Sequence, residues 1–435
     1  MPAGPARLRL PPLDAVLALA AWAALIVAAR ALVAPLYHDD HRVLIGNAPL
    51  VGQLDLRTTW RIVAGLALGA AAVVWGPRLA TRLSWTRLLA LTGAAAFVWA
   101  VALAASDGLA HVWQPLETRY EYLHDVPLVS RMPDFLHTFA PLAPLYDFHV
   151  HAHPPLMLLV FWAMSKVGLG GGEAAAIVVI AMGAAAAPAA LVALRELGGE
   201  ERARAAAPFL AFAPAAVYVA TSPDAFYMGV FAIGVALFAV AAGRPGDTVG
   251  DACAFGSGLV LGASLFLTYG VVTLGAIVLA IAVYRRALRP LLMAAGGVLA
   301  VVLAFLAGGF WWYDGLQSAR ELQLAGVYQR RPYAEFLVNS PAAFALVIGP
   351  AVAVGLARLR DRGVWLLTGT ALLALLVADL SGYARGETER VWLPFAPWLL
   401  IATCALSPSL RGRQGWLALQ VATAIGLQVA AKGPW

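Results

Sequence analysis

The sequence predicts an all-α protein that crosses a membrane many times. Of its 435 residues, 61% are hydrophobic and only 12% are charged, whereas charged residues make up about a quarter of an ordinary soluble domain. The hydrophobic residues occur in repeated blocks of about 16 to 24, the length that a helix needs to cross the hydrocarbon core of a bilayer. Short charged segments separate these blocks, so we expect a polytopic helical bundle.

The hydrophobic blocks predict about thirteen crossings. The first block is too long for a signal peptide and no suitable cleavage site follows it, so we expect it to be a retained span. Cys253 and Cys404 lie inside hydrophobic blocks and are expected to be core residues, not partners in a disulfide. The expected crossings are 14–36, 59–78, 86–106, 173–194, 205–221, 225–243, 253–268, 269–284, 290–309, 337–357, 364–380, 391–406 and 415–431.

The distribution of arginine predicts the orientation of the chain. Short loops with an excess of Lys and Arg stay in the cytoplasm. This rule places the N-terminus on the cytoplasmic side of the plasma membrane and the C-terminus on the outer side. This scheme requires that the apolar helix at 153–168 lies in the outer interface or re-enters, because a crossing there would put "RELGGEERAR" (195–204) outside. The arginines are spread over many loops and form no single stripe, which argues against nucleic acid as a partner.

A long polar segment, residues 107–172, is expected on the outer face, together with all eight histidines. Its charges lie among aromatic residues and prolines, which favours ordered juxtamembrane helices over a flexible linker. Glu117, Glu121 and Asp125 are spaced by four residues, so on a helix they would share one face. From the spacing alone, a solvated acidic face neutralised by a nearby arginine is slightly favoured over a catalytic group.

Four stretches follow one another in a recognisable order: "LETRYEYL" (116–123), "HPPLMLLVFW" (153–162), "ATSPDAFYMG" (220–229) and "ETERVWLPFAPWLL" (387–400). Together they resemble the C-type (GT-C) superfamily of membrane glycosyltransferases, to which protein O-mannosyltransferases and the lipid A aminoarabinose transferase belong. In that superfamily an acidic motif with Arg-Tyr precedes a Lys- or His-Pro-Pro-Leu helix. An Asp follows a helix end in the second outer loop, and an Arg-aromatic-Pro helix comes late in the chain.

The likeness covers roughly residues 86–405 and implies three parts. Two extra transmembrane helices occupy 1–85, the GT-C-like module occupies 86–405, and the last helix and tail occupy 406–435. The chain departs from the superfamily at Leu116-Glu117, where the relatives have a paired Asp-Glu. The identity of the base is therefore left open.

The resemblance implies that a sugar is transferred from a polyprenyl phosphate to a hydroxyl group on the extracytoplasmic face, where the acceptor is an envelope glycan, a glycolipid or a protein. An outer-loop carboxylate would act as general base. Glu117 or Asp125 would take this role, with Glu121 behind them. Asp224 would be a second acidic residue of the site, although its position after Ser222-Pro223 is equally that of a helix cap.

The phosphate of such a donor needs cations near the outer surface, and the guanidinium group matches its geometry. The resemblance implies substrate contacts for Arg119, Tyr120 and His153. Candidates for contacts with the phosphate are Arg320, Arg330, Arg331, Arg385 and Arg390. Contacts with the headgroups of membrane lipids are the alternative role for these five arginines.

The histidines of "HVHAH" alternate, which would place His149, His151 and His153 on one face of an extended segment. Imidazole is a good ligand for zinc and similar ions, and some GT-C enzymes bind a divalent metal ion near this loop. A role for His153 in lining the substrate cavity ranks first, a polar interface second, and a metal site at His149 and His151 third.

A transporter or flippase for an envelope lipid is the chief rival function. Transport needs polar groups at the bilayer midplane, and the expected crossings carry almost no charge there. This pattern favours chemistry at the outer surface over transport.

Overall fold

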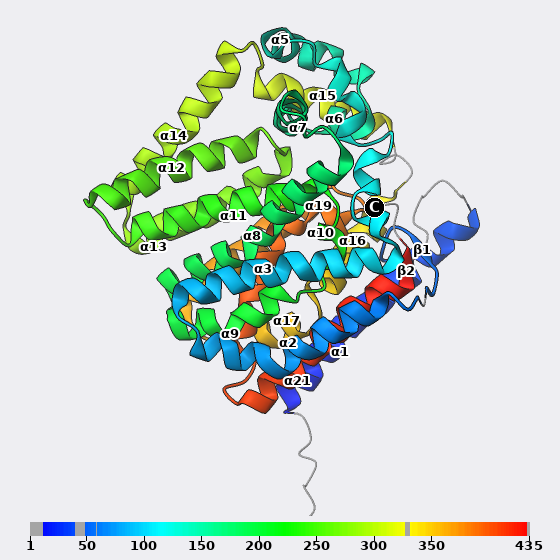
Figure 1. Cartoon of the computed structure of the whole chain (residues 1–435), viewed down its shortest axis with the longest axis vertical. Helices are drawn as coiled ribbons and strands as arrows, with labels where there is room; N and C mark the ends of the chain where they lie inside the picture. The colour runs from blue at the N-terminus through cyan, green and yellow to red at the C-terminus, as the bar shows by residue number, and fades with distance from the viewer. Residues whose placement is uncertain (1–11, 40–47, 58, 327–330, 433–435) are drawn as a thin grey trace, which may run out of the picture.

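The computed structural model describes residues 12–39, 48–57, 59–326 and 331–432, which form a bundle of helices (Figure 1). Two short strands, β1 (Gln53–Leu54) and β2 (Ala431–Lys432), pair antiparallel. The α-helices are α1 (Leu13–Asp39), α2 (Ile62–Arg82), α3 (Trp85–Ala104), α4 (Tyr122–Asp125), α5 (Met132–Leu142), α6 (Phe148–Ala152), α7 (Leu156–Lys166), α8 (Gly172–Gly198), α9 (Glu200–Ala211), α10 (Ala216–Val219), α11 (Pro223–Ala242), α12 (Thr248–Leu265), α13 (Gly275–Arg285), α14 (Leu288–Ala307), α15 (Trp312–Ala325), α16 (Tyr333–Ile348), α17 (Pro350–Arg358), α18 (Arg362–Leu380), α19 (Thr388–Val391), α20 (Ala396–Leu400) and α21 (Leu410–Ala430).

Within the described residues, eight helices are long and apolar enough to cross a membrane, or nine spans if the bent pair α16 and α17 counts as one. The helical, multi-span class predicted from composition agrees with this finding, but thirteen crossings are not confirmed. Several expected crossings are interrupted. The block 205–221 is divided between α9 and α10, and the block 391–406 consists of the short α20 between two 3₁₀ turns.

The apolar helix that follows the two prolines, α7, has only 11 residues. At 1.5 Å per residue it is about 16 Å long, roughly half the thickness of the hydrocarbon core. A helix of this length does not cross a bilayer alone, which agrees with the interfacial or re-entrant placement expected for 153–168.

Small residues allow the central helices to approach one another closely. A β-carbon at Gly229 of α11 would collide with the carbonyl oxygen of Met182 on α8, and one at Gly183 of α8 would lie 2.9 Å from the β-carbon of Ala225 on α11. Between α12 and α14, a β-carbon at Gly258 would likewise strike the backbone. Close backbone approach through glycine is a common way of packing helices within membranes.

A sharp bend of 93° separates α16 from α17 and explains why the expected crossing at 337–357 is not one straight helix. The residue at the bend is Gly349, whose φ of 82° lies in the region that favours glycine. Gln420 of α21 satisfies the backbone on both sides. Its Nε2 donates to the carbonyl oxygen of Ile348 at 2.8 Å, and its Oε1 accepts from the amide of Ala351 at 3.2 Å.

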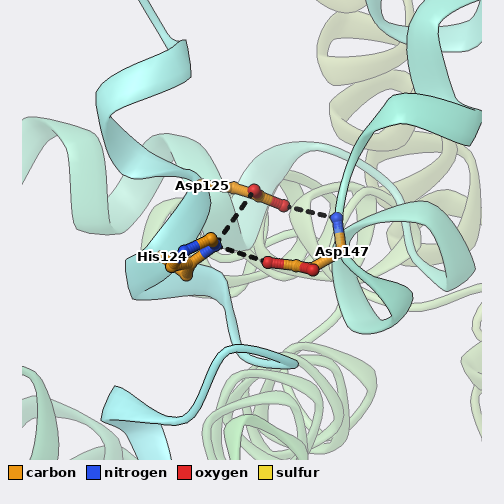
Figure 2. A group of neighbouring side chains, drawn as sticks. All are labelled: His124, Asp125 and Asp147. Atoms are coloured by element: carbon orange, nitrogen blue, oxygen red, sulfur yellow. Dashed lines mark hydrogen bonds and ion pairs between the residues drawn. The ribbon is translucent and has the colours of Figure 1, made fainter.

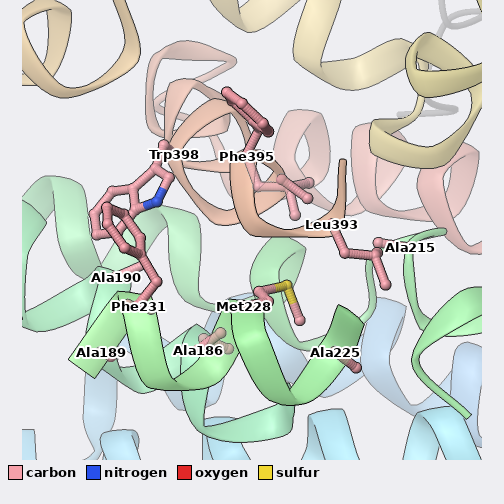
Figure 3. Close-up of a cluster of buried hydrophobic side chains, with 14 of the residues drawn as sticks. Ala186, Ala189, Ala190, Ala215, Ala225, Met228, Phe231, Leu393, Phe395 and Trp398 are labelled. Atoms are coloured by element: carbon pink, nitrogen blue, oxygen red, sulfur yellow. The ribbon is translucent and has the colours of Figure 1, made fainter. Parts of the chain in front are cut away.

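The short helices of the segment 107–172 gather at one end of the bundle. Figure 1 shows α5, α6 and α7 there together with α15, whereas α9, α17 and α21 lie towards the opposite end. The segment around α20 is anchored to α11 by a buried apolar cluster (Figure 3). In it, the rings of Trp398 and Phe231 meet edge to face with centroids 6.3 Å apart. This packing fixes the position of α19, which precedes the cluster in the chain.

Candidate functional site

Arg390 lies at the centre of a buried group of ionisable side chains. Its Nη1 donates to Oδ2 of Asp224 at 2.9 Å, and its Nη2 donates to Oε2 of Glu387 at 2.8 Å. Nη2 also lies 2.7 Å from Nε2 of His149. The side chains of Arg390 and Asp224 are only 4% and 3% exposed. We call Arg390, Asp224, Glu387, His149 and Glu121, whose contact follows, the Arg390 cluster.

The contact between Arg390 and His149 determines the tautomer of the imidazole. A guanidinium nitrogen only donates, so Nε2 of His149 must accept and the ring proton of the neutral form lies on Nδ1. Nδ1 is 2.9 Å from Oε1 of Glu121, an ion-pair distance without the alignment of a hydrogen bond. The second oxygen of Glu121, Oε2, is buried and has no hydrogen-bond partner among the described residues. Glu121 therefore combines a neighbouring imidazole with an acceptor atom that is not satisfied.

Local structure explains how these residues reach one another. Asp224 lies in the first turn of α11, where Oγ of Ser222 accepts from the amide of Asp224 at 3.2 Å and donates to its Oδ2 at 2.9 Å. α19 is held by Thr388, whose hydroxyl group donates to the carbonyl oxygen of Ser340 at 3.0 Å. Asp224 was predicted as either a helix cap or a site residue. Here the cap is Ser222, and the carboxylate of Asp224 faces Arg390.

The charges of the cluster compensate one another. Burial opposes the positive charge of Arg390, but Glu387, Asp224 and Glu121 raise its pKa above the usual range, so it stays protonated. Burial alone would raise the pKa of Glu387, but Arg390 and Arg331 outweigh that effect and lower it. At neutral pH the cluster therefore contains an ion pair between Arg390 and Glu387, with Asp224 on the other side of the guanidinium.

Aromatic side chains and His153 lie beside the cluster. The hydroxyl groups of Tyr122 and Tyr227 are 2.7 Å apart, and the ring centroids of both lie about 6 Å from that of His153, at 6.2 and 5.7 Å. Nδ1 of His153 donates to the carbonyl oxygen of His149 at 2.9 Å. Burial lowers the pKa of His153. A neutral imidazole with its Nε2 as acceptor is therefore the expected state at neutral pH.

The three carboxylates spaced by four residues do not share one face, because the segment is not a continuous helix. A short 3₁₀ turn ends at Glu117, and α4 begins only at Tyr122. Glu117 is exposed and lies beside Gly172 at the start of α8, Glu121 faces His149, and Asp125 lies near Asp147. Of the three, only Glu121 joins the Arg390 cluster.

The other predicted substrate contacts have varied surroundings. Arg119 and Tyr120 are exposed, and the guanidinium stacks over the ring with its Cζ 4.7 Å from the centroid. Arg331 is buried and lies 4.0 Å from Glu387, which connects it to the Arg390 cluster. Arg331 and Arg385 each donate to the backbone carbonyl oxygen of the other, at 2.5 and 3.0 Å. Arg330 lies outside the described residues.

His149 and His151, the third alternative for a metal site, have different partners, and neither belongs to the group of possible metal ligands found among the described residues. His149 contacts Arg390, whose positive charge disfavours a cation there, and Nε2 of His151 lies 3.0 Å from Oγ of Ser318 on α15. A different group has the spacing of metal ligands. His124, Asp125 and Asp147 each offer one ligand atom, and these atoms lie within 4.8 Å of one another (Figure 2).

Sequence reasoning missed Glu387 and Glu389, although both belong to the quoted stretch "ETER". Glu389 is completely buried, and its Oε1 accepts from the amide of Val51 at 2.8 Å. Burial raises the pKa of Glu389 to about 7. Two acidic residues beside an arginine in an otherwise apolar stretch were the available signal.

Comparisons with known proteins give no relative. The chain matches no family model, no curated protein and no solved structure.

Proposed function

We propose that the protein is a glycosyltransferase of the cell envelope that moves a sugar from a polyprenyl phosphate to a hydroxyl acceptor on the extracytoplasmic face. The acceptor oxygen attacks the anomeric carbon, the bond from this carbon to the phosphate oxygen breaks, and polyprenyl phosphate leaves with the bonding electrons. A carboxylate of the outer layer takes the proton of the hydroxyl group.

The observation that carries this proposal is the environment of Glu121. Its Oε2 is buried and receives no hydrogen bond from the part of the chain that the structure describes, and its Oε1 faces the Nδ1 of His149. A base needs one oxygen available for the proton and a fixed orientation, and His149, held in turn by Arg390, provides that orientation. Among the predicted candidates Glu117, Glu121 and Asp125, we therefore assign the base to Glu121.

Arginines close to the base would bind the departing phosphate. Nη2 of Arg331 lies 4.0 Å from Oε1 of Glu387, and Oε2 of Glu387 accepts a hydrogen bond from Arg390. The carboxylate of Glu387 therefore lies between two guanidinium groups. Arg390 is enclosed by its own partners, and we propose that it keeps the charges of the site in place. Arg331 and Arg385 are the proposed phosphate contacts, because each donates to the backbone carbonyl oxygen of the other, which holds the two cationic residues together.

The proposal includes a GT-C-like core within residues 86–405, about thirteen crossings and a cytoplasmic N-terminus in the plasma membrane. Here the interrupted segments around α9 and α20 would count as crossings that combine short helices. The arginine-rich loops support the orientation. Labelling of single cysteines with an impermeant thiol reagent, in a background without Cys253 and Cys404, tests it. Labelling of position 200 and protection of position 151 in intact cells would contradict it.

A transfer assay tests the proposed reaction. Purified protein in lipid nanodiscs is given synthetic polyprenyl phosphates that carry different sugars, and release of polyprenyl phosphate is measured. Glu121→Gln should lower turnover about a hundred- to ten-thousandfold, the usual contribution of a general base. Glu117→Gln is the matched control and should keep most of the turnover, since Glu117 is exposed beside Gly172.

Two results would contradict the proposal. Equal turnover by wild type and Glu121→Gln would mean that Glu121 is not the general base. Movement of the intact donor between leaflets of proteoliposomes, without any release of polyprenyl phosphate, would favour the transporter instead.

A further inference from the structure

Three side chains of the outer layer, His124, Asp125 and Asp147, converge outside the Arg390 cluster; we call them the His124 group. Nδ1 of His124 lies 2.6 Å from Oδ2 of Asp147 and 3.9 Å from Oδ1 of Asp125. The backbone amide of Asp147 donates to Oδ2 of Asp125 at 2.8 Å, which holds the two carboxylates side by side. Figure 2 shows the three side chains pointing towards a common space.

Asp125 is the unusual member of the His124 group because its carboxylate is buried. Its side chain is only 4% exposed. Oδ2 accepts from the amide of Asp147, whereas Oδ1 accepts no hydrogen bond from the described residues and is turned towards His124. Burial of the side chain as a whole disfavours the negative charge of Asp125 unless a cation compensates it.

The negative charge of the His124 group exceeds the positive charge within reach. Within the described residues, the only cationic partner found within 4.0 Å of either carboxylate is His124. Even a protonated imidazole would neutralise only one of the two carboxylates. The side chains of His124 and Asp147 are 62% and 29% exposed, so an ion from solution reaches the space between them.

We propose that Nδ1 of His124, Oδ1 of Asp125 and Oδ2 of Asp147 bind a divalent transition-metal ion. Imidazole with carboxylates suits zinc or manganese better than calcium or magnesium, which prefer oxygen ligands alone. Ligand distances of about 2.0 to 2.2 Å require that His124 and Asp147 separate slightly, which their exposed side chains allow. The open side of the group leaves further coordination positions to water.

The position of this site means that a bound metal ion would connect two short helices. His124 and Asp125 end α4, which Glu121 directly precedes, and Asp147 directly precedes α6, which contains His149. An ion bound between them links α4 to α6 and thereby fixes Glu121 against His149. The metal site itself does not depend on the proposed sugar transfer, because it rests on the three ligands alone.

Metal binding by the full chain tests the proposal. Untagged protein is treated with a chelator, purified in detergent, and titrated with Zn²⁺ by calorimetry and with Mn²⁺ by electron paramagnetic resonance. One ion should bind per chain, and pulsed resonance should detect nitrogen coupling from one imidazole. His124→Gln should abolish that coupling, and both His124→Gln and Asp147→Asn should weaken binding at least about tenfold, as loss of one ligand implies.

The matched control is Asp134→Asn, because Asp134 is an exposed carboxylate of the same layer that pairs with Arg131 at 2.8 Å. It should bind the ion as wild type does. Elution as a single species shows that each variant is folded. The proposal is overturned if folded wild-type protein binds neither ion, or if His124→Gln and Asp147→Asn bind as tightly as Asp134→Asn.

Discussion

The Arg390 cluster and the His124 group are built on the same two short helices, yet their charges are balanced in different ways. α4 and α6, each taken with the residue directly before it, supply Glu121 and His149 to the first, and His124, Asp125 and Asp147 to the second. In the Arg390 cluster a guanidinium from α19 compensates the carboxylates. In the His124 group no arginine or lysine of the described chain takes that place. The protein itself thus balances the negative charge of the Arg390 cluster, whereas we propose that a cation from solution balances that of the His124 group.

The largest effect should follow loss of the internal cation. Arg390→Met keeps the volume but leaves the buried Asp224 without its cation and leaves Glu387 with Arg331 alone, which should cost about 3 to 5 kcal/mol in the free energy of unfolding. Denaturant titration in mixed micelles measures this difference. The exposed Arg119→Met should change stability by no more than about 0.5 kcal/mol. Equal stability of both variants would contradict the balance that we describe for the Arg390 cluster.

Loss of one carboxylate from the Arg390 cluster should have a smaller effect. Asp224→Asn keeps a hydrogen-bond acceptor for Nη1 of Arg390, and Glu387 remains as counter-charge. We expect a loss of about 1 to 3 kcal/mol, the cost of weakening one charge-assisted hydrogen bond. A double-mutant cycle with Arg390→Met separates their coupling from the individual effects. Additive single effects would mean that the two side chains are not coupled.

The pH dependence of stability should identify Glu389 as the acid that the cluster does not neutralise. Its pKa is raised from 4.5 to about 7, so below pH 4.5 both folded and unfolded chains hold the proton. Between these values only the folded chain does, so stability falls as the pH rises from about 4.5 to about 7 and changes little above that. Glu389→Gln should have a higher Tm than wild type by about 2 °C or more at pH 8, and no advantage at pH 5.

The control for the pH experiment is Glu201→Gln, which changes an exposed acid on α9. Its Tm should follow that of wild type across the whole range. A constant difference between Glu389→Gln and wild type from pH 5 to pH 8 would exclude titration of Glu389.

The smallest effect is expected in the His124 group. In metal-free protein, Asp147→Asn removes one of two neighbouring carboxylates, and the half-exposed pair with His124 contributes little. The change in unfolding free energy should lie within about 0.5 kcal/mol. A loss of unfolding free energy as large as that of Asp224→Asn would mean that the protein itself balances the charge of the His124 group, as it does in the Arg390 cluster.

Composition and block length were sufficient to predict the membrane class, because burial in a bilayer demands long apolar helices whatever their packing. The number of crossings could not be predicted in the same way. The bend at Gly349 is satisfied by Gln420, which is far away in the sequence, and no local pattern announces that contact. Short helices such as α9 and α10 likewise divide a block that is uniformly apolar.

The candidate site was predicted as separate residues and not as a group. Asp224, His149 and Arg390 were all named from motifs, but the contacts of Arg390 to the other two join residues 166 and 241 positions apart. The helical spacing of Glu117, Glu121 and Asp125 was misleading, because a 3₁₀ turn ends at Glu117 and α4 begins only at Tyr122, so each carboxylate lies in different surroundings. Asp147 was not predicted, since nothing in its neighbourhood distinguishes it from a helix cap.

The bend between α16 and α17 also sets an order of events during synthesis. The two helices have 16 and 9 residues, and they qualify as one broken span only together. The hydrogen bonds that Gln420 makes to their backbone reach back 69 and 72 positions, so these partners leave the ribosome long before the glutamine does. Unsatisfied backbone groups are costly in lipid. We therefore expect the insertion machinery to protect the bend from lipid until α21, which contains Gln420, has been synthesised.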